Sequence, residues 1–197
     1  DKGLISTTDK FLCTGEICSK DGKPYAHGLL SVEDALKVSC NDVFAKVGGE
    51  IGYSDMIDYL SKMGLFKPVL NLKGENREEA KGIKPTLENS MNNISIGQTI
   101  MVTPIQMAGL YNTVVNDGVF IKPSIVESIV DDDDNQIESL TESGNRIFSE
   151  TASKLAQETM SKVIWEGSGF EAKVDGVNIG GKTGTSTGYG LSLIHIS

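Results

Sequence analysis

Two short segments carry side chains that could take part in nucleophilic or acid–base catalysis. Residues 39–41 read Ser-Cys-Asn, which places a hydroxyl two residues before a carboxamide, and residues 182–185 read Lys-Thr-Gly-Thr, which places an ammonium group beside two hydroxyls. Hydroxyls and lysines supply nucleophiles and proton relays in catalysis. Either segment alone has little weight, because a Ser-x-Asn pattern arises by chance about once in every few hundred residues of ordinary composition.

Each of these residues also has an ordinary structural interpretation. Ser39 could be a hydroxyl in the interior of a helix, and Asn41 could be a local cap. Lys182 could be a surface lysine on the edge of a sheet, where lysine commonly opposes aggregation. Taken without further context, the residues leave both interpretations open.

A helix is expected to position the first segment. Ser31, with Asp34 three residues later, is similar to a capping box, and apolar residues follow at helical spacing. We expect this helix to end at the pair of glycines 48–49. Ser39–Asn41 would then lie midway along it.

The remaining chain alternates between predicted helices and extended segments. Capping residues and apolar spacing predict three more helices, which begin at or after Ser54, Thr103 and Ser149. A long polar connection is expected over 65–95, and extended chain over 119–130 leads into four aspartates at 131–134, which we interpret as a solvated hairpin tip. A strand within 174–185 is expected to carry Lys182.

The composition fits one globular domain. The chain has 197 residues, of which 39% are hydrophobic and 23% charged, so it can bury one sizeable core. The formal net charge of −9 argues against a nucleic-acid partner, because phosphate neutralisation needs clustered basic residues. The sequence contains neither an apolar stretch of about 18 residues nor a secretory leader, so a protein that acts outside the cytoplasm would need a targeting segment upstream of Asp1.

The cysteines leave two interpretations open. Cys13 and Cys18 are close enough in sequence to form a disulfide or share a metal, whereas unpaired thiols are the more ordinary interpretation, and Cys40 stands alone. The chain has two histidines, His27 and His195, and no second pair of cysteines. We therefore expect no closed four-ligand zinc site and no metal ligands.

Three segments together resemble the transpeptidase domain of a class B penicillin-binding protein. Residues 28–51 are similar to the Ser-x-Asn region of that family, and 178–185 resemble its Lys-Thr-Gly motif. Residues 95–108, with Ser-Ile-Gly-Gln and then Val-Thr-Pro-Ile-Gln-Met-Ala, are similar to the segment between these motifs. The likeness keeps its order over about residues 1–190, and the Thr-Pro-x-Gln helix and the acidic hairpin favour class B over a class A β-lactamase.

The resemblance implies an α+β fold of the β-lactamase/transpeptidase-like type, with an antiparallel sheet flanked by helices and an all-helical lobe between the second motif and the sheet. It implies acyl transfer on D-Ala-D-Ala stem peptides through a serine acyl-enzyme, without a cofactor. The implied partners are peptidoglycan stem peptides, β-lactam antibiotics and cell-wall synthesis proteins. The implied location is the extracytoplasmic face of the bacterial cell membrane, through an upstream anchor. A serine β-lactamase or D,D-carboxypeptidase of the same superfamily, or a non-catalytic β-lactam sensor or scaffold, is the alternative.

The resemblance also assigns roles to residues at matching positions. Ser39 would pass a proton towards the leaving nitrogen, and Asn41 would hold a substrate amide and the catalytic lysine. Lys182 would supply positive potential that favours hydroxyl deprotonation and attracts the substrate carboxylate. The Thr183 and Thr185 hydroxyls would bind that carboxylate, and the Thr185 N–H would form half of the oxyanion hole. Gly184, which has no Cβ, would allow a close approach of the substrate backbone.

Two features depart from the family pattern. The chain contains no Ser-x-x-Lys motif, so the nucleophile and its lysine are expected just before Asp1, and the chain alone is predicted to be inactive. The family continues after Thr185 through two more strands and a helix, which residues 191–197 do not match. We interpret 1–190 as a partial transpeptidase domain and 191–197 as a non-native tail without a specific packing partner.

Overall fold

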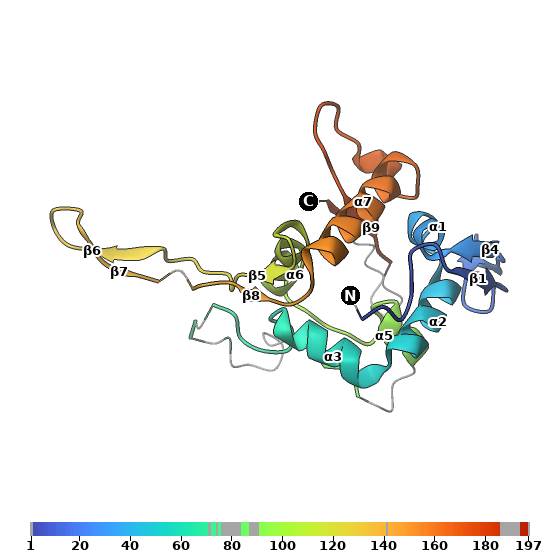
Figure 1. Cartoon of the computed structure of the whole chain (residues 1–197), viewed down its shortest axis with the longest axis horizontal. Coiled ribbons are helices and arrows are strands. Elements are labelled where there is room, and N and C mark those ends of the chain that lie inside the picture. Colours follow the sequence, from blue (N-terminus) through green and yellow to red (C-terminus); the bar gives the residue numbers. More distant parts are fainter. Residues whose placement is uncertain are drawn as a thin grey trace. The chain divides into compact units, whose positions relative to one another are not determined.

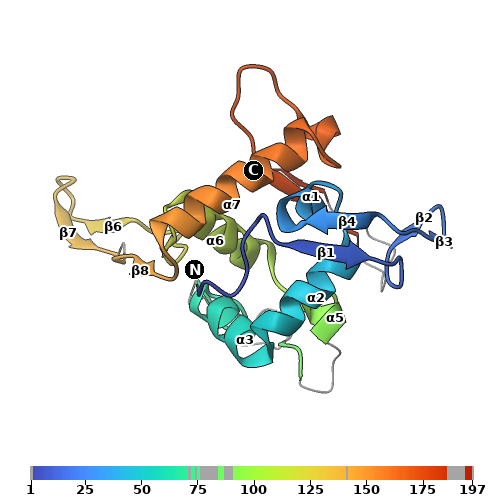
Figure 2. The ribbon, with the colours of Figure 1, turned by 45° about the vertical axis from the view of Figure 1, so that its right-hand side comes forward.

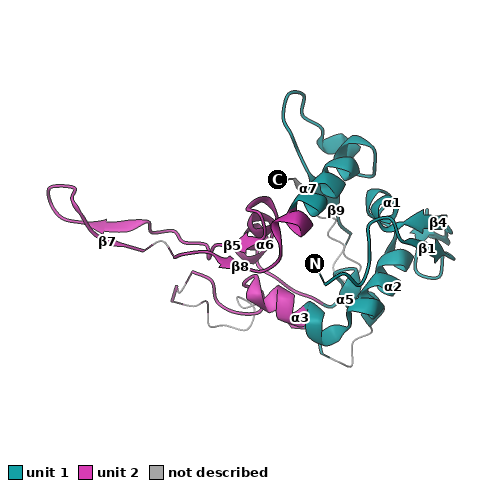
Figure 3. Cartoon of the chain, in the orientation of Figure 1, with its two compact units in different colours: residues 1–56, 85–99, 154–197 teal, residues 57–84, 100–153 magenta. Residues whose placement is uncertain are grey.

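The computed structural model describes residues 2–70, 72–73, 75, 84–86, 91–140, 142–185 and 194–196, and it combines helices with short antiparallel strand pairs (Figure 1). The chain forms two compact units (Figure 3). Unit 1 contains residues 1–56, 85–99 and 154–197, and unit 2 contains 57–84 and 100–153. None of the helices in the described part of the chain has the length and apolar character needed to cross a membrane.

The first part of unit 1 is a set of short strands. β1 (Lys10–Cys13) pairs antiparallel with β4 (Gly28–Ser31), so that Cys13 lies opposite Gly28. Between them, β2 (Ser19–Lys20) and β3 (Lys23–Pro24) form a small hairpin. Figure 2 shows β1 and β4 side by side, with the first helix following β4 directly.

The predicted helix after Ser31 is divided in two. α1 (Val32–Lys37) begins as expected, because the Ser31 hydroxyl accepts a hydrogen bond from the Asp34 N–H at 3.0 Å. The chain then leaves helical geometry at Ser39, whose φ is +57°, and resumes as α2 (Asn41–Ile51). The prediction of one continuous helix was therefore wrong, and the Ser39–Asn41 segment lies at a junction between two helices.

The glycines at 48–49 do not end α2. The helix continues through them and ends at Gly52, whose φ of +78° suits glycine. Glycine in a helix interior costs only about 1 kcal/mol relative to alanine, which surrounding contacts can offset. Gly48 packs closely against Ser95 of α5 (Met91–Ser95), since a Cβ on Gly48 would lie 1.7 Å from the Ser95 Oγ.

We expect Gly48→Ala and Gly49→Ala to change stability in opposite directions. Gly48→Ala forces Ser95 to move, and such overpacking costs about 1–3 kcal/mol. A Cβ at Gly49 meets nothing within 4 Å, so alanine there should stabilise the helix by about 0.5–1 kcal/mol. Urea unfolding of both variants measures the difference, and equal stability of the two would contradict the close packing of α2 on Ser95.

The core of unit 1 contains an unexpected set of metal-ligand side chains. Cys13, Cys18 and Cys40 are buried free thiols that cluster with Ala35 and Val43. The ligand atoms of these three cysteines and of His27 all lie within 4.8 Å of one another. Our expectation that no four-ligand set could form was wrong. It rested on the lack of a second pair of neighbouring cysteines, whereas the fold brings together three cysteines and one histidine from separate parts of the chain.

Unit 2 contains helices together with strand pairs. α6 (Pro104–Val115) begins with the expected cap, in which the Thr103 hydroxyl and the Gln106 side chain satisfy each other's backbone N–H groups. α3 (Tyr53–Lys62) has its first four residues in unit 1 and the rest in unit 2, and it begins one residue before the predicted Ser54. The all-helical lobe implied by the resemblance is in this structure a mixed α/β unit.

The strands of unit 2 include the acidic hairpin. β5 (Val119–Phe120) pairs with β8 (Asn145–Arg146), and β6 (Ser128–Val130) pairs with β7 (Gln136–Ser139). The tip between β6 and β7 is exposed, and an Asp131 carboxylate oxygen accepts hydrogen bonds from the N–H groups of Asp133 and Asn135. The prediction of a solvated hairpin tip is confirmed.

The last part of the chain supplies α7 and the strand with the Lys-Thr-Gly motif. α7 (Glu150–Trp165) starts after Ser149 as predicted, and a short 3₁₀ helix (Phe170–Ala172) follows. The predicted strand over 174–185 is shorter, because β9 covers only Gly181–Thr183. β9 pairs antiparallel with β10 (Ile194–Ile196), whereas we expected the tail to lack a partner. Residues 186–193 and 197 lie outside the described part of the chain.

Candidate active site

Ser39 and Lys182 lie in direct contact. The Lys182 Nζ donates a hydrogen bond to the Ser39 Oγ at 2.6 Å, which joins the helix junction to β9 within unit 1. The N–H groups of Ser39 and Cys40 donate to the carbonyls of Leu36 and Ala35, at 3.1 and 2.8 Å. These bonds hold Ser39 in a left-handed conformation that is costly for serine, and such strained backbone is concentrated at functional sites.

Lys182 is a desolvated cation. Its Nζ also donates to the Thr183 carbonyl oxygen at 2.8 Å. Burial lowers the pKa of Lys182 from 10.5 to about 8. A lysine with a pKa near neutrality can both carry a positive charge and give up a proton, which are the two properties that acyl transfer needs beside a serine.

The position of β9 relative to α1 is fixed by the residues after α7. The Ser168 Oγ lies 3.0 Å from the Thr183 Oγ1, and the Ser168 N–H donates to the Lys37 carbonyl at 2.9 Å. A Cβ on Gly167 would lie 2.5 Å from the same Lys37 carbonyl oxygen, so the loop and the end of α1 are in close contact. The loop after α7 therefore connects the last residue of α1 to β9, which brings Ser39 and Lys182 together.

The other predicted site residues have different surroundings. Asn41 is the first residue of α2, and within the part of the chain that the structure describes its side chain makes no hydrogen bond to Lys182. Gly184 and Thr185 are exposed at the end of β9. The Thr185 carbonyl accepts a hydrogen bond from the Gln98 Nε2 at 3.0 Å.

Sequence reasoning did not assign Ser168 or the contact of Gln98. Ser168 lies between two glycines, where a loop is expected but no ligand is indicated. Gln98 belongs to the Ser-Ile-Gly-Gln segment of the resemblance, to which the sequence analysis assigns no role. Their contacts with Thr183 and Thr185 indicate that both residues support the strand that carries the motif.

Cys40, between Ser39 and Asn41, is not a nucleophile in this arrangement. Burial raises the pKa of its thiol to about 12 and also raises the pKa of Cys18. Reactive cysteines have lowered pKa values and are partly exposed, whereas the Cys40 side chain is fully buried.

Comparison with known families decides the affiliation of the chain. The model of the penicillin binding protein transpeptidase domain matches residues 5–192. The chain belongs to this family. The match covers Ser39–Asn41 and Lys182–Thr185, the two segments that meet in the structure.

Curated relatives agree with this affiliation. The chain is 30% identical over 176 residues to stage V sporulation protein D of Bacillus subtilis, covering 86% of the chain and 26% of that protein. It is 34% identical over 148 residues to the penicillin-binding protein PbpB of Mycolicibacterium smegmatis, covering 69% of the chain and 22% of PbpB. The chain thus spans about a quarter of the length of these relatives.

Solved structures support the fold. A crystal structure of penicillin binding protein 3 from Mycobacterium tuberculosis, complexed with aztreonam, aligns with a TM-score of 0.77 at 24% sequence identity. The same protein complexed with ampicillin aligns with a TM-score of 0.78. Each alignment covers 97% of this chain and 46% of the penicillin binding protein 3 chain. The expected α+β fold of the transpeptidase type is confirmed.

Proposed function

We propose that this chain is part of a class B, serine-type peptidoglycan D,D-transpeptidase. The observation that carries the proposal is the 2.6 Å contact between the Lys182 Nζ and the Ser39 Oγ. This contact joins the two family motifs, which are far apart in the sequence. The remaining part of the active site, the nucleophilic serine and its lysine, would come from a Ser-x-x-Lys segment of the same protein outside this chain.

The contact geometry supports a proton relay through Ser39. Because the Ser39 oxygen accepts from Lys182, its own O–H is free to donate to the nitrogen of the leaving D-Ala. As the bond between the substrate carbonyl carbon and that nitrogen breaks, the Ser39 proton passes to the nitrogen and the Lys182 ammonium replaces the proton on Ser39. A lysine pKa of about 8 suits this transfer near neutral pH.

The end of β9 is suited to hold the substrate. The hydroxyls of Thr183 and Thr185, next to the Lys182 charge, would bind the terminal carboxylate, and the Thr185 N–H would serve half of the oxyanion hole. Gly184 has no side chain to obstruct a substrate backbone that pairs with the strand. Asn41 would orient a substrate amide from the first turn of α2.

The proposed substrates are peptidoglycan stem peptides, and β-lactams would bind as substrate mimics. Support comes from the aztreonam and ampicillin complexes of the similar penicillin binding protein 3. The proposed location is the outer face of the bacterial cell membrane, together with other cell-wall synthesis proteins. We also propose that 1–190 is the family domain and that 191–197 is a non-native addition. The family match ends at residue 192, two residues into this tail, and the pairing of β10 with β9 is the observation against a non-native origin.

Labelling with fluorescent penicillin tests this function. A protein that contains this chain and the preceding Ser-x-x-Lys segment should form a stoichiometric covalent adduct, detected by intact mass, that hydrolyses slowly. The 197-residue chain alone should form none, because Ser39 and Lys182 only assist the nucleophile. Rapid turnover of the longer protein would indicate a β-lactamase instead, and an adduct on the chain alone would overturn the assignment of the nucleophile.

A further inference from the structure

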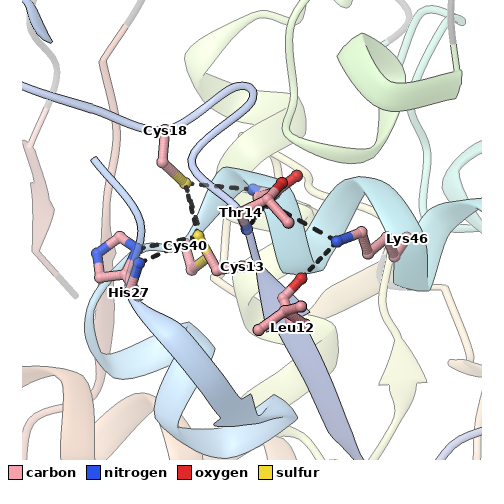
Figure 4. Close-up of polar contacts among 8 residues, drawn as sticks. Leu12, Cys13, Thr14, Cys18, His27, Cys40 and Lys46 are labelled. Atoms are coloured by element: carbon pink, nitrogen blue, oxygen red, sulfur yellow. Dashed lines mark hydrogen bonds and ion pairs between the residues drawn. The ribbon is translucent and has the colours of Figure 1, made fainter. Parts of the chain in front are cut away.

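We propose that Cys13, Cys18, His27 and Cys40 form a structural zinc site with three thiolates and one imidazole. Cys13 ends β1, Cys18 precedes β2, His27 precedes β4 and Cys40 precedes α2. Figure 4 shows the three sulfur atoms and the imidazole directed towards one another. Three cysteines with one histidine is an established ligand set for closed, structural zinc sites.

Three of the six distances among the four ligand atoms are close to those of a tetrahedral zinc ion, and all six lie within 4.8 Å. With Zn–S near 2.3 Å and Zn–N near 2.0–2.1 Å, tetrahedral geometry requires S···S distances of about 3.8 Å and S···N distances of about 3.6 Å. The structure has 3.8 Å between the Cys13 and Cys18 sulfurs and 3.6 Å between those of Cys18 and Cys40. The Cys13 Sγ lies 3.4 Å from the His27 Nδ1.

Hydrophobic burial does not account for the order of the segment that carries these ligands. Cys18 is the one buried residue between Glu16 and Ala26, where nearly every other side chain is exposed. Ordering a backbone residue costs about 1–2 kcal/mol of conformational entropy, so the burial of one thiol is too small to offset the ordering of eleven residues. A metal ion that bonds to Cys18 and His27 supplies the missing stabilisation.

Two backbone N–H groups and one helix N-terminus face the sulfurs and favour their thiolate forms, whereas burial favours the neutral thiols until a metal ion binds. The backbone N–H of His27 donates to the Cys13 sulfur and the backbone N–H of Asp42 donates to the Cys18 sulfur, each at 3.4 Å. Cys40 stands at the N-terminus of an eleven-residue helix, where the dipole favours negative charge. Hydrogen bonds of this kind orient the ligands and tune metal sites.

Binding is an exchange of protons for metal. One Zn²⁺ replaces the protons of three thiols, while His27 binds through its neutral Nδ1, so the occupied site carries one negative charge and three protons are released. The ion would cross-link β1, the β2–β3 hairpin and the start of α2. Through Cys40 it would fix the backbone between Ser39 and Asn41, so its role would be to position the Ser-x-Asn segment.

Zinc content and cobalt spectra of the 197-residue chain test the proposal. Protein folded with zinc under reducing conditions should retain about one ion per chain after gel filtration. Replacement by Co²⁺ should give the visible bands of tetrahedral cobalt and a sulfur-to-cobalt charge-transfer band. A zinc content near zero, or a Cys13–Cys18 disulfide in the mass spectrum of this sample, would overturn the proposal.

Substitutions separate ligation from folding. His27→Ala and Cys40→Ala should lose the bound zinc, whereas Ser19→Ala, an exposed neighbour of Cys18, should retain it. His27→Cys should retain one zinc and change the cobalt spectrum towards that of four thiolates, which a failure to fold could not mimic. An unchanged cobalt spectrum in His27→Cys would show that His27 is not a ligand.

Discussion

Acylation by penicillin should slow about 10²- to 10⁴-fold in Ser39→Ala, the range that general acid–base groups contribute. The variant is made in a protein that contains this chain and the Ser-x-x-Lys segment, and stopped-flow fluorescence measures the rate. Ser39 accepts from Lys182 at 2.6 Å and is the one hydroxyl of the helix junction, so its loss interrupts the proposed relay. The exposed Ser19→Ala serves as the control and should acylate normally.

A second variant at the same position separates the hydroxyl from the backbone. Ser39 has a φ of +57°, a conformation that glycine adopts more readily than alanine. Ser39→Gly should therefore be more stable than Ser39→Ala but equally slow in acylation. Recovery of the rate in Ser39→Gly would mean that backbone geometry, and not the proton relay, explains the defect.

The capping residues show which parts of the fold are locally determined. Ser31 and Thr103 each begin a helix in the predicted place, because a hydroxyl that binds a free N–H three residues later acts within a single turn. The break at Ser39 was not predicted, since the apolar spacing runs on through this residue. The hydrogen bond from the Ser168 N–H to the Lys37 carbonyl and the burial of Cys40 both depend on contacts between distant parts of the chain, which periodicity does not contain.

The two sites differ in how far the sequence could predict them. The resemblance to the family placed Ser39 and Lys182 in one site, since neither motif is specific alone, but their direct contact was not predicted. The cysteine–histidine cluster was excluded by a count of cysteine pairs, although the four ligands were all present. Its ligands come from the ends of four elements, so only the pairing of β1 with β4 and the return of the chain at α2 bring them together.

Lys182→Ala should slow acylation about 10²- to 10³-fold, the effect of removing one preorganised charge or donor from a site where negative charge develops. Lys182 is desolvated, so its charge acts through a medium of low dielectric. Lys154→Ala, on the exposed side of α7, is the matched control. If the two variants acylate at the same rate, the Lys-Thr-Gly strand has only a structural role in this protein.

The pH dependence of acylation should identify the charge on Lys182. Burial lowers the pKa of Lys182 from 10.5 to about 8, so the free protein loses this positive charge as the pH rises through about 8. The apparent second-order rate constant, which reports the free protein, should therefore fall above that pH. In Lys182→Arg the charge persists, because arginine has a pKa above 12. Arginine changes the geometry and lowers the overall rate, but the fall above pH 8 should disappear from the profile. A fall that persists unchanged in Lys182→Arg would assign the titration to another group.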